Sequence, residues 1–326
     1  MSEILRVENL TTRLSARDGS AAAVDGVSFS VHAGRTLGLV GESGSGKSLT
    51  CLSILRLLPP ALSQAGGSVW FKGENLFDKS PRAMTAIRGG QIGMILQDPM
   101  TSINPLFTIG DQVGEVFRYH RGVSGRRNLW ARAVETLRRV HIPAAEERVG
   151  SYPHQFSGGM RQRIAIGMNV GCEPDLLIAD EPTTALDVTI RLQILSLLRE
   201  IQAARGMAMI LVTHDLHLVS RFCDEVAVMY GGRIVEQGPV ARVFNDPAHP
   251  YTKGLIGAVP KIARHAERLA VIPGQPPLAG EHGAGCRFAP RCAKAQPRCF
   301  SHYPDDRRFE DDRRAVACWV PEGLPS

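Results

Sequence analysis

The sequence contains no run of about 18 apolar residues, the length that a membrane-spanning helix requires. Its first residues, Met1 to Arg6, include an acid and no apolar central region, so we expect no secretory leader. Internal repeats and low-complexity segments are lacking as well. With 326 residues, 44% of them hydrophobic and 21% charged, the chain has the balance of a globular protein with one large domain and a smaller one.

A strong excess of one charge is also missing. The formal net charge is +6, which would suit nucleic acid or an anionic membrane surface if it were concentrated in one place. The basic residues are scattered, however, and acids accompany them, as at Asp305 and Asp306 beside Arg307 and Arg308. We therefore interpret the chain as a mildly basic cytosolic protein and expect no nucleic-acid partner.

Cysteine is sparse in most of the chain. Three of the seven cysteines (Cys51, Cys172 and Cys223) are isolated and are expected to be small buried apolar residues. The other four gather near the C-terminus: Cys286, Cys292, Cys299 and Cys318. A cytosolic chain disfavours disulfides there. Four thiolates can hold a [4Fe–4S] cluster or a tetrahedral Zn²⁺, and a reduced, metal-free tail is the third alternative.

The hydrophobic pattern indicates an α/β fold. Residues 24–31 alternate as a half-buried strand does, and 36–40 form a short apolar run ending in a glycine-rich turn. We expect a buried strand there, followed by a helix that extends through residues 51–58 and stops at Pro59 and Pro60.

Later segments repeat this alternation of elements. Residues of about 105–170 have a helical pattern, and the apolar runs 176–179 and 210–212 are typical of buried parallel strands. Apolar residues recur between these runs at intervals of three and four, which predicts an amphipathic helix: Val188, Leu192, Leu195, Leu198 and Ile201. Strand, helix and strand in this order predict a sheet with crossover connections.

A phosphate-binding loop follows the strand at 36–40. Residues 41–48 read GESGSGKS and match G-x-x-x-x-G-K-S in full. Backbone amides of such a loop point at phosphates, and the next helix presents its positive N-terminus to them. We expect Lys47 to reach the β- and γ-phosphates of ATP and the Ser48 hydroxyl to bind Mg²⁺. The predicted nucleotide-binding residues here are Gly41, Ser43, Gly44, Ser45, Gly46, Lys47, Ser48 and Leu49.

An acidic pair, Asp180 and Glu181, directly follows the apolar run at 176–179. Ligands of open α/β sheets bind beyond the carboxyl ends of the strands. We therefore expect Asp180 to hold Mg²⁺, directly or through water, and Glu181 to orient or deprotonate the attacking water.

A second anion-binding helix start precedes this pair. Residues 156–163 read FSGGMRQR, and Ser157, Gly158 and Gly159 open a helix. The segment resembles the signature motif of ABC ATPases, in which two subunits enclose ATP and each signature loop contacts the partner's nucleotide. The resemblance covers roughly residues 3 to 280 with the motifs in matching order. It implies an ABC-type core with an antiparallel β subdomain and a helical subdomain at about 105–170.

Three further positions resemble functional motifs of this family. Gln97 resembles the glutamine that senses Mg²⁺ and water and touches the transmembrane partner, and His214 resembles the histidine that contacts the γ-phosphate. Ala185, Leu186 and Asp187 resemble the D-loop that links the two sites, which implies that Asp187 takes part in the nucleotide site. The implied catalytic residues are Glu181, His214 and Gln97, and the implied Mg²⁺ ligands are Ser48, Gln97 and Asp180.

Other features are similar to the peptide and nickel importer subfamily. Met160 in the signature motif, the stretch 153–156 before it, and residues 249–255 and 272–277 all carry this similarity. It implies an ATP-binding domain at 1–255 and a C-terminal extension at 256–326 whose four cysteines hold an iron–sulfur cluster. The implied machine imports dipeptides or oligopeptides, with nickel, glutathione or another small solute as the alternative.

The same resemblance implies partners and a location. The partners are a second ATPase subunit (identical or a paralogue), two transmembrane permeases and a periplasmic or extracellular solute-binding protein. The location is the cytoplasmic face of the cell inner membrane. One departure stands out, because residues 10–15 contain no aromatic to stack on adenine, which leaves Leu14 or another residue to pack against the base. An ABC ATPase acting on ribosomes or DNA and a degenerate subunit without hydrolysis are the rivals, and the single cassette and intact motifs disfavour both.

Overall fold

The computed structural model describes residues 2–14, 21–97, 102–184, 186–259, 271–281, 283–309 and 313–323. The chain divides into two compact units. Unit 1 comprises Met1–Ile4, His32–Arg35 and Asp78–Ile210, and unit 2 comprises Leu5–Val31, Thr36–Phe77 and Leu211–Ser326. In the described residues, none of the helices is both long and apolar enough to cross a membrane.

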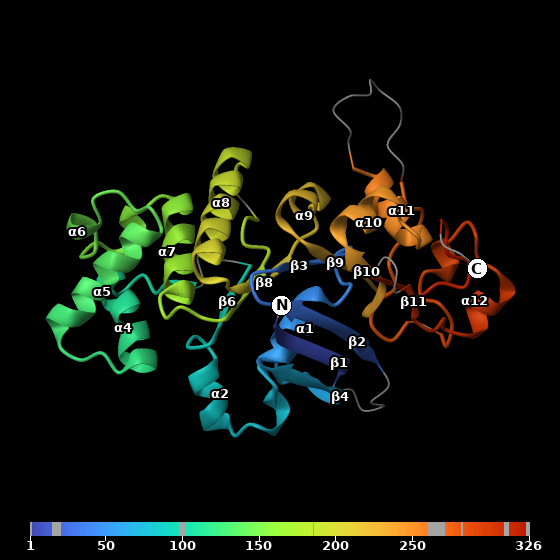
Figure 1. Cartoon of the computed structure of the whole chain (residues 1–326), viewed down its shortest axis with the longest axis horizontal. Helices are drawn as coiled ribbons and strands as arrows, with labels where there is room; N and C mark the ends of the chain where they lie inside the picture. Colours follow the sequence, from blue (N-terminus) through green and yellow to red (C-terminus); the bar gives the residue numbers. More distant parts are fainter. Residues whose placement is uncertain are drawn as a thin grey trace. The chain divides into compact units, whose positions relative to one another are not determined.

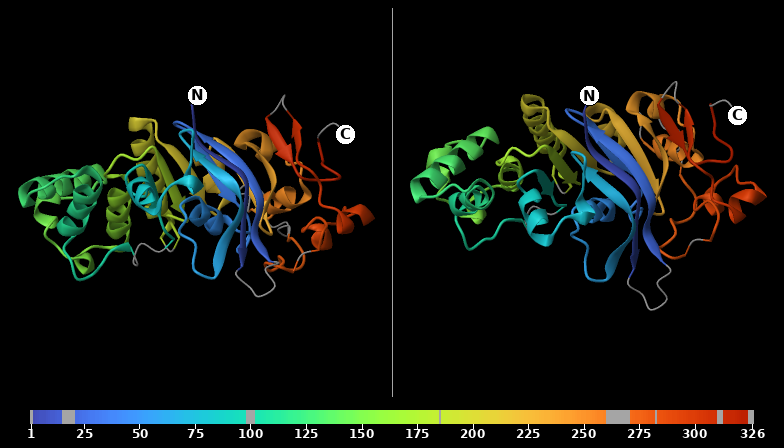
Figure 2. Two further views of the ribbon diagram at one scale, coloured as in Figure 1. Left: turned by 90° about the horizontal axis from the view of Figure 1, so that it is seen from below. Right: turned by 60° about the horizontal axis from the view of Figure 1, so that its bottom comes forward.

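An antiparallel sheet accounts for much of the N-terminal part of unit 2. Its strand order is β2-β1-β4-β5, formed by β1 (Glu3–Leu14), β2 (Ala22–His32), β4 (Leu62–Phe71) and β5 (Glu74–Asn75). The alternation predicted for 24–31 is confirmed, because Val27, Phe29 and Val31 are buried. Figure 2 shows the blue strands of this sheet side by side in both views.

The second sheet of unit 2 carries the phosphate-binding loop. Its order is β11-β12-β10-β9-β3, with β3 at Thr36–Val40, β9 at Glu225–Tyr230 and β10 at Arg233–Pro239. Strand β3 is parallel to β9 and wholly buried, which confirms the strand predicted at 36–40. Strand β12 (Arg314–Val316) continues the sheet antiparallel to β10, and β11 (Arg307–Phe309) is antiparallel to β12, so this C-terminal segment is hydrogen-bonded into the sheet.

The helix after the phosphate loop is shorter than the sequence predicted. Helix α1 spans Lys47–Ile54 and ends before Pro59, so the predicted continuation to residue 58 is wrong. Arg56 adopts a left-handed backbone conformation (φ 54°), and the N–H of Leu57 donates back to the carbonyl of Leu52. A left-handed turn of this kind closes a helix without any proline.

Four further short helices belong to unit 2: α9 (Leu216–Phe222), α10 (Val240–Asn245), α11 (Pro250–Gly257) and α12 (Pro297–Ser301). A single turn of 3₁₀ helix, Ala289–Arg291, lies between two of the C-terminal cysteines. Helices α10 and α11 lie beside each other in Figure 1. Tyr230, Tyr251 and Phe288 are buried in the apolar core of this unit, together with Val226, Val228 and Val243.

Unit 1 contains the strands that lead to the acidic pair. Strands β6 (Ile92–Ile95) and β7 (Leu176–Asp180) are parallel, with Ile92 opposite Leu176, and β8 (Ala208–Val212) follows β7 in the order. All residues of β7 and β8 are buried, which confirms the two predicted strands. Helix α2 (Pro81–Ile87) precedes β6 and begins at the N-cap Ser80.

The helical pattern predicted for 105–170 is confirmed. It comprises α4 (Ile109–Arg121), α5 (Arg126–Arg139), α6 (Ala145–Arg148), the 3₁₀ turn Pro153–Gln155 and α7 (Gly158–Val170), drawn in green to yellow-green in Figure 1. Gly114 lets α4 approach α5 closely, because a Cβ there would lie 3.2 Å from Cβ of Leu129.

Helix α8 (Val188–Arg205) lies where the amphipathic helix was predicted. Leu195 and Leu198 are buried, at 2% and 1% exposed. Val188 and Leu192, which share the predicted stripe, are 69% and 37% exposed. The first turns of α8 therefore present apolar side chains outward.

Candidate functional site

The phosphate loop in unit 2 depends on two glycines that no other residue could replace. A Cβ on Gly41 would lie 2.2 Å from the carbonyl oxygen of Met229, and one on Gly46 would lie 2.9 Å from that of Ala23. Gly46 also has φ 99° and is the N-cap of α1. The loop backbone therefore approaches β9 and β2 so closely that only glycine fits, and the loop leads directly into the N-terminus of α1.

Lys47, the first residue of α1, points its ammonium group back over the loop. Its Nζ donates to the carbonyl oxygens of Gly41 (2.8 Å) and Glu42 (2.9 Å) and lies 3.4 Å from Oγ of Ser45. Lys47 is only 6% exposed, so its positive charge is largely shielded from water inside the loop. Of the remaining predicted residues, Ser43 and Gly44 lie on the turn of the loop, and Ser48 and Leu49 lie in the first turn of α1.

His214 belongs to the same unit. The N–H of Thr213 donates to the carbonyl of Leu39 in β3 at 3.3 Å, so the segment before His214 runs beside the strand that leads into the phosphate loop. Asp215 caps α9 by accepting from the N–H of His217 at 3.0 Å, which fixes the turn on the other side of His214. The His214 side chain is exposed.

The acidic pair and the glutamine come together in unit 1. Asp180 ends β7 and is 4% exposed, and Glu181 adopts a left-handed backbone conformation at φ 47°. Gln97 Nε2 donates to Glu181 Oε2 at 3.3 Å, and the Thr184 hydroxyl donates to the same oxygen at 2.8 Å. A non-glycine residue in this conformation is strained, and such strain concentrates at functional sites. Thr184 was not predicted from the sequence; it lies three residues after Glu181, the spacing of a turn.

The start of the signature helix is an open N-terminus. The hydroxyl of Ser157 caps α7 by accepting from the N–H of Met160 at 3.3 Å. A Cβ on Gly159 would lie 3.0 Å from Ile190 of α8, so this glycine serves packing. A Cβ on Gly158 would meet nothing within 4 Å, so the chain's own packing does not require glycine there.

Two predicted motifs are only partly described. Asp187 caps α8 by accepting from the N–H of Ile190 at 2.9 Å, while Ala185 lies outside the described residues. Residues 98–101, which follow Gln97, lie outside them as well. For adenine, Leu10 is fully buried and Leu14 is half-buried, and Ser15 lies outside the described residues.

The four C-terminal cysteines line one cavity, together with His249, Phe288, Trp319 and Val320 among others. Burial raises the pKa of the Cys286 and Cys292 thiols and raises that of Cys318 to about 11, and the neighbouring cysteines add to each rise. All seven cysteines are free thiols. Within the described part of the chain, no three His, Cys, Asp or Glu side chains lie close enough together to ligate a single metal ion.

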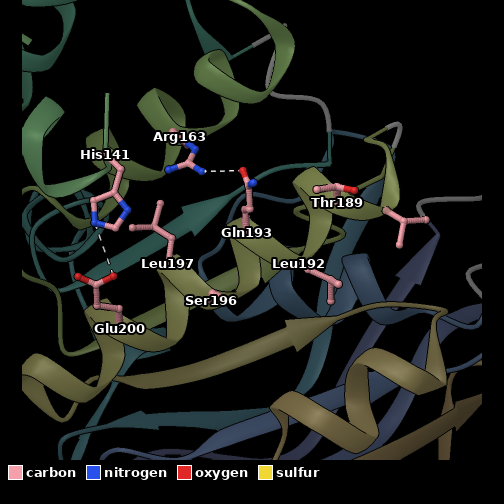
Figure 3. Close-up of a pocket in the computed structure, with 9 residues that line it drawn as sticks. His141, Arg163, Thr189, Leu192, Gln193, Ser196, Leu197 and Glu200 are labelled. Carbon is pink, nitrogen blue, oxygen red and sulfur yellow. Dashed lines mark hydrogen bonds and ion pairs between the residues drawn. The ribbon is translucent and has the colours of Figure 1, made fainter. Parts of the chain in front are cut away.

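Another pocket lies in unit 1, between α8 and the residues after α5 (Figure 3). His141 Nε2 lies 3.6 Å from Glu200 Oε2, and Arg163 of the signature helix donates to Gln193 at 3.0 Å. The exposed Val188 and Leu192 belong to its lining, but no residue predicted to bind nucleotide or Mg²⁺ does. This pocket is therefore distinct from the nucleotide-binding residues.

Sequence reasoning also missed the residues that hold Glu42, the second residue of the phosphate loop. The Tyr251 hydroxyl accepts from the N–H of Glu42 at 2.9 Å, and Arg291 forms two hydrogen bonds with its carboxylate. The only available signal was an acid inside an anion-binding loop, which calls for a cation nearby.

Comparisons with known proteins agree with this arrangement. A family model described as ABC transporter matches residues 24–184, and one described as oligopeptide/dipeptide transporter, C-terminal region, matches residues 235–299. The chain is 46% identical to the dipeptide transport ATP-binding protein DppD of Bacillus subtilis over 323 residues, which cover 99% of this chain and 96% of that protein.

Solved structures are similar as well. The dimeric, post-hydrolysis structure of the ATP-binding cassette MJ0796 with ADP and Pi has a TM-score of 0.65 at 26% identity, covering 73% of this chain and 99% of that chain. For cbiO1 from Clostridium perfringens, part of the ABC transporter complex cbiONQ, the TM-score is 0.64 at 29% identity, covering 75% of this chain and 92% of that chain.

The phosphate loop and its buried lysine, together with an acidic pair at the end of a buried strand, define a P-loop ATPase. The chain belongs to the ABC transporter family, as an ATP-binding subunit with the C-terminal region of oligopeptide and dipeptide transporters. It is an ATPase coupled to transport, and ATP with Mg²⁺ is its nucleotide substrate.

Proposed function

We propose that this chain powers the import of dipeptides or oligopeptides across a bacterial inner membrane from its cytoplasmic face. The observation that carries the proposal is the similarity to a dipeptide transport ATP-binding protein over 99% of the chain, extension included. The match of residues 235–299 to the C-terminal region of oligopeptide and dipeptide transporters supports the same class of solute.

The roles proposed within the ATPase are those that the family resemblance implies, and contacts inside each unit support several of them. Lys47 and the loop amides bind the phosphates, while Ser48, Asp180 and Gln97 hold Mg²⁺ and its water. Glu181 aligns the attacking water, and its carboxylate is already oriented by Gln97 and Thr184. His214, next to the strand before the phosphate loop, completes the γ-phosphate contacts. Positioning and charge stabilisation of this kind account for most of the catalysis of phosphoryl transfer.

A second ATPase subunit is the proposed partner of the signature helix. Ser157 and Gly158 form a helix N-terminus with open space in front of Gly158, which suits an anion brought by another chain. The exposed Val188 and Leu192 at the start of α8 suit burial against that chain, with Asp187 immediately before them. The similar cassette MJ0796 is itself dimeric.

The permease is proposed to contact the helical part of unit 1. A groove is lined by Phe107, Tyr119 and Met168 among others, and Leu106 beside it is 78% exposed. Exposed aromatic and aliphatic side chains around a groove suit an apolar helix of a partner. The family resemblance extends the assembly to two permeases and a solute-binding protein.

The four-cysteine cavity is proposed to hold a [4Fe–4S] cluster with a structural role. In a zinc site all four sulfurs bind one ion at about 2.3 Å, whereas each cysteine of a [4Fe–4S] cluster binds a different iron. The four thiols share one cavity. Zinc sites usually contain C-x₂₋₄-C pairs, and the intervals of five, six and eighteen residues between these cysteines include none, which favours the cluster over zinc. The Phe288, Trp319 and Val320 side chains would shield it from water.

Uptake measurements test the transport proposal. A strain that lacks this chain should lose uptake of a labelled dipeptide and regain it with the wild-type chain but not with the Lys47→Ala chain. Unchanged dipeptide uptake combined with lost nickel or glutathione uptake would replace the peptide by that solute. Recovery of the chain with ribosomes instead of membranes would contradict the proposal altogether.

A further inference from the structure

The acid inside the phosphate loop is neutralised by an arginine of the C-terminal extension. Arg291 Nη1 lies 2.7 Å from Glu42 Oε2, and Nη2 lies 3.1 Å from Oε1, so the pair is bidentate. The Arg291 side chain is only 6% exposed and that of Glu42 is 24% exposed. Paired ions of this geometry, shielded from water, are among the stronger side-chain interactions in proteins.

Arg291 is itself held rigidly. Its Nε donates to the carbonyl of Pro273 at 2.8 Å, and Nη1 also donates to the Tyr230 hydroxyl at 3.2 Å. Tyr230 packs against Tyr251 and Phe288, with ring centroids 4.6 and 5.2 Å away. The guanidinium group therefore has few alternative positions, and its hold on Glu42 transmits the position of the extension to the loop.

Two further contacts connect the extension and α11 to the loop. Tyr251 of α11 accepts the backbone N–H of Glu42, and the Glu42 carbonyl in turn accepts from Lys47 at 2.9 Å. Arg287 donates to the carbonyl of Gly231 and pairs with Asp25. The next residue, Gly232, donates its N–H to the carbonyl of Ser45 at 2.9 Å. The segment between Cys286 and Cys292 thus supports the loop at Glu42 directly and at Ser45 through the β9–β10 turn.

An unpaired carboxylate at position 42 would repel the triphosphate, because Glu42 is part of the loop assigned to the phosphates and its side chain is only 24% exposed. It would also leave the carbonyl that Lys47 contacts free to move. Pairing with Arg291 removes both effects at once. The arginine therefore acts on nucleotide binding through Glu42.

We propose that Arg291 is a positioning residue for ATP binding, which holds and neutralises Glu42 so that the phosphate loop keeps its binding conformation. The extension is thereby an integral part of the nucleotide site. Because the segment that carries Arg291 ends at two cysteines of the four-cysteine cavity, the packing of that cavity and the affinity for nucleotide are linked, and linkage is reciprocal. The inference rests on the assignment of residues 41–48 as the phosphate loop.

Nucleotide titrations of the full-length chain test the proposal. We expect Arg291→Gln to raise the Kd for MgATP roughly fivefold to a hundredfold, the range of typical coupling between sites. The KM for ATP should rise likewise, while kcat at saturating ATP stays within about twofold, because the hydrolytic residues are untouched. Arg308→Gln, an exposed arginine of β11, is the matched control and should leave both constants unchanged.

A second substitution separates positioning from a merely structural role. In the Arg291→Gln/Glu42→Gln chain the stranded charge is gone and two amides can pair, so affinity should recover severalfold relative to Arg291→Gln alone. Lost packing in the extension would not be rescued in this way. Circular dichroism and thermal unfolding establish whether each chain is folded. If the Arg291→Gln chain does not fold, nucleotide affinity is compared between Arg291→Lys and the double variant instead.

Two results would overturn the proposal: a Kd within twofold of wild type in Arg291→Gln, or a weakened Kd that Glu42→Gln does not improve. Lys47→Ala distinguishes failure of the underlying assignment. If that chain binds ATP normally, residues 41–48 are not the phosphate loop. If it loses ATP while Arg291→Gln does not, only the role of Arg291 is refuted.

Discussion

The side-chain amide of Gln97 lies 3.3 Å from the carboxylate of Glu181, although 84 positions separate the two residues in the chain. The contact joins the end of β6 to the end of β7 and holds the proposed catalytic carboxylate in one orientation. Because the amide donates to that carboxylate, any change at Gln97 alters the charge distribution around Glu181.

Gln97→Ala should therefore lower kcat and leave nucleotide binding intact. We expect a loss of roughly tenfold to a hundredfold in the ATPase rate, the size of effect produced by removing one positioned hydrogen bond to a charged group. The Kd for MgATP should change by less than about threefold, since Lys47 and the loop amides supply most of the phosphate contacts. A rate unchanged in a folded Gln97→Ala chain would contradict the role of this contact. Rates of phosphate release and nucleotide titrations provide the measurements.

Glu181→Gln should stop turnover while ATP still binds. Loss of a general base or water-orienting carboxylate costs roughly a hundredfold to ten-thousandfold in rate. Glu200→Gln, an exposed acid of α8 that pairs only weakly with His141, is the control and should retain full activity. Normal turnover in the Glu181→Gln chain would show that another residue orients or deprotonates the attacking water.

Gly158→Ala tests whether this glycine is needed for contact with a partner subunit or for folding. Because a Cβ at this position meets nothing within 4 Å, alanine should leave the melting temperature unchanged or raise it, with a gain of up to about 1 kcal/mol in the helix. If another subunit's phosphate approaches this helix start, the methyl group should reduce ATP-driven dimerisation and ATPase activity severalfold. Gly283→Ala, at an equally open glycine, is the control. Dimerisation is measured by size-exclusion chromatography with ATP in a Glu181→Gln background, and an undiminished dimer would place the partner elsewhere.

The four-cysteine cavity predicts a specific metal content. Chain purified without oxygen should contain about four irons and four sulfides, with the broad visible absorption of a [4Fe–4S] cluster. Cys292→Ser should lose both the iron and the absorption, while Cys223→Ser, at a cysteine outside the cavity, should lose neither. A content of one zinc per chain and no iron would show that the cysteines bind zinc instead.

Glu322 predicts a small, pH-dependent contribution to stability. Lys253 and Lys294 lower the pKa of its carboxyl group from 4.5, so the folded state favours the ionised form. Its contribution is therefore present at neutral pH and is lost as the pH falls from 4.5 through the lowered pKa. Glu322→Gln should lower the free energy of unfolding by no more than about 1 kcal/mol at pH 7, because both lysines are exposed. Urea unfolding at pH 7 and below pH 4 measures this, and an equal difference at both values would contradict the assignment.

The strands and the phosphate loop were predictable because their signals are local. The apolar run at 36–40 and the glycine spacing at 41–48 report on neighbouring residues, and the structure has the strand and the turn where these patterns put them. The end of α1 was predicted wrongly, because the left-handed turn at Arg56 depends on backbone hydrogen bonds and not on the prolines that follow.

Contacts between residues far apart in the chain could not be predicted from local sequence patterns. Arg291 and Glu42 lie 249 positions apart, and no periodicity relates an arginine between two cysteines to an acid in a phosphate loop. The exposure of Val188 and Leu192 could not be predicted either. The spacing of apolar residues shows which of them share a helix face, but not which part of that face the rest of the protein covers.

The pairing of β12 with β10 has a practical consequence for the gene that encodes this chain. A stop codon that removed residues after about 300 would leave Glu236 and Gln237 without the neighbours they now have in Val316 and Ala315. Strand β10 would then be an exposed edge strand that could pair with strands of other chains. Early termination should accordingly produce an insoluble product instead of a shorter, active ATPase.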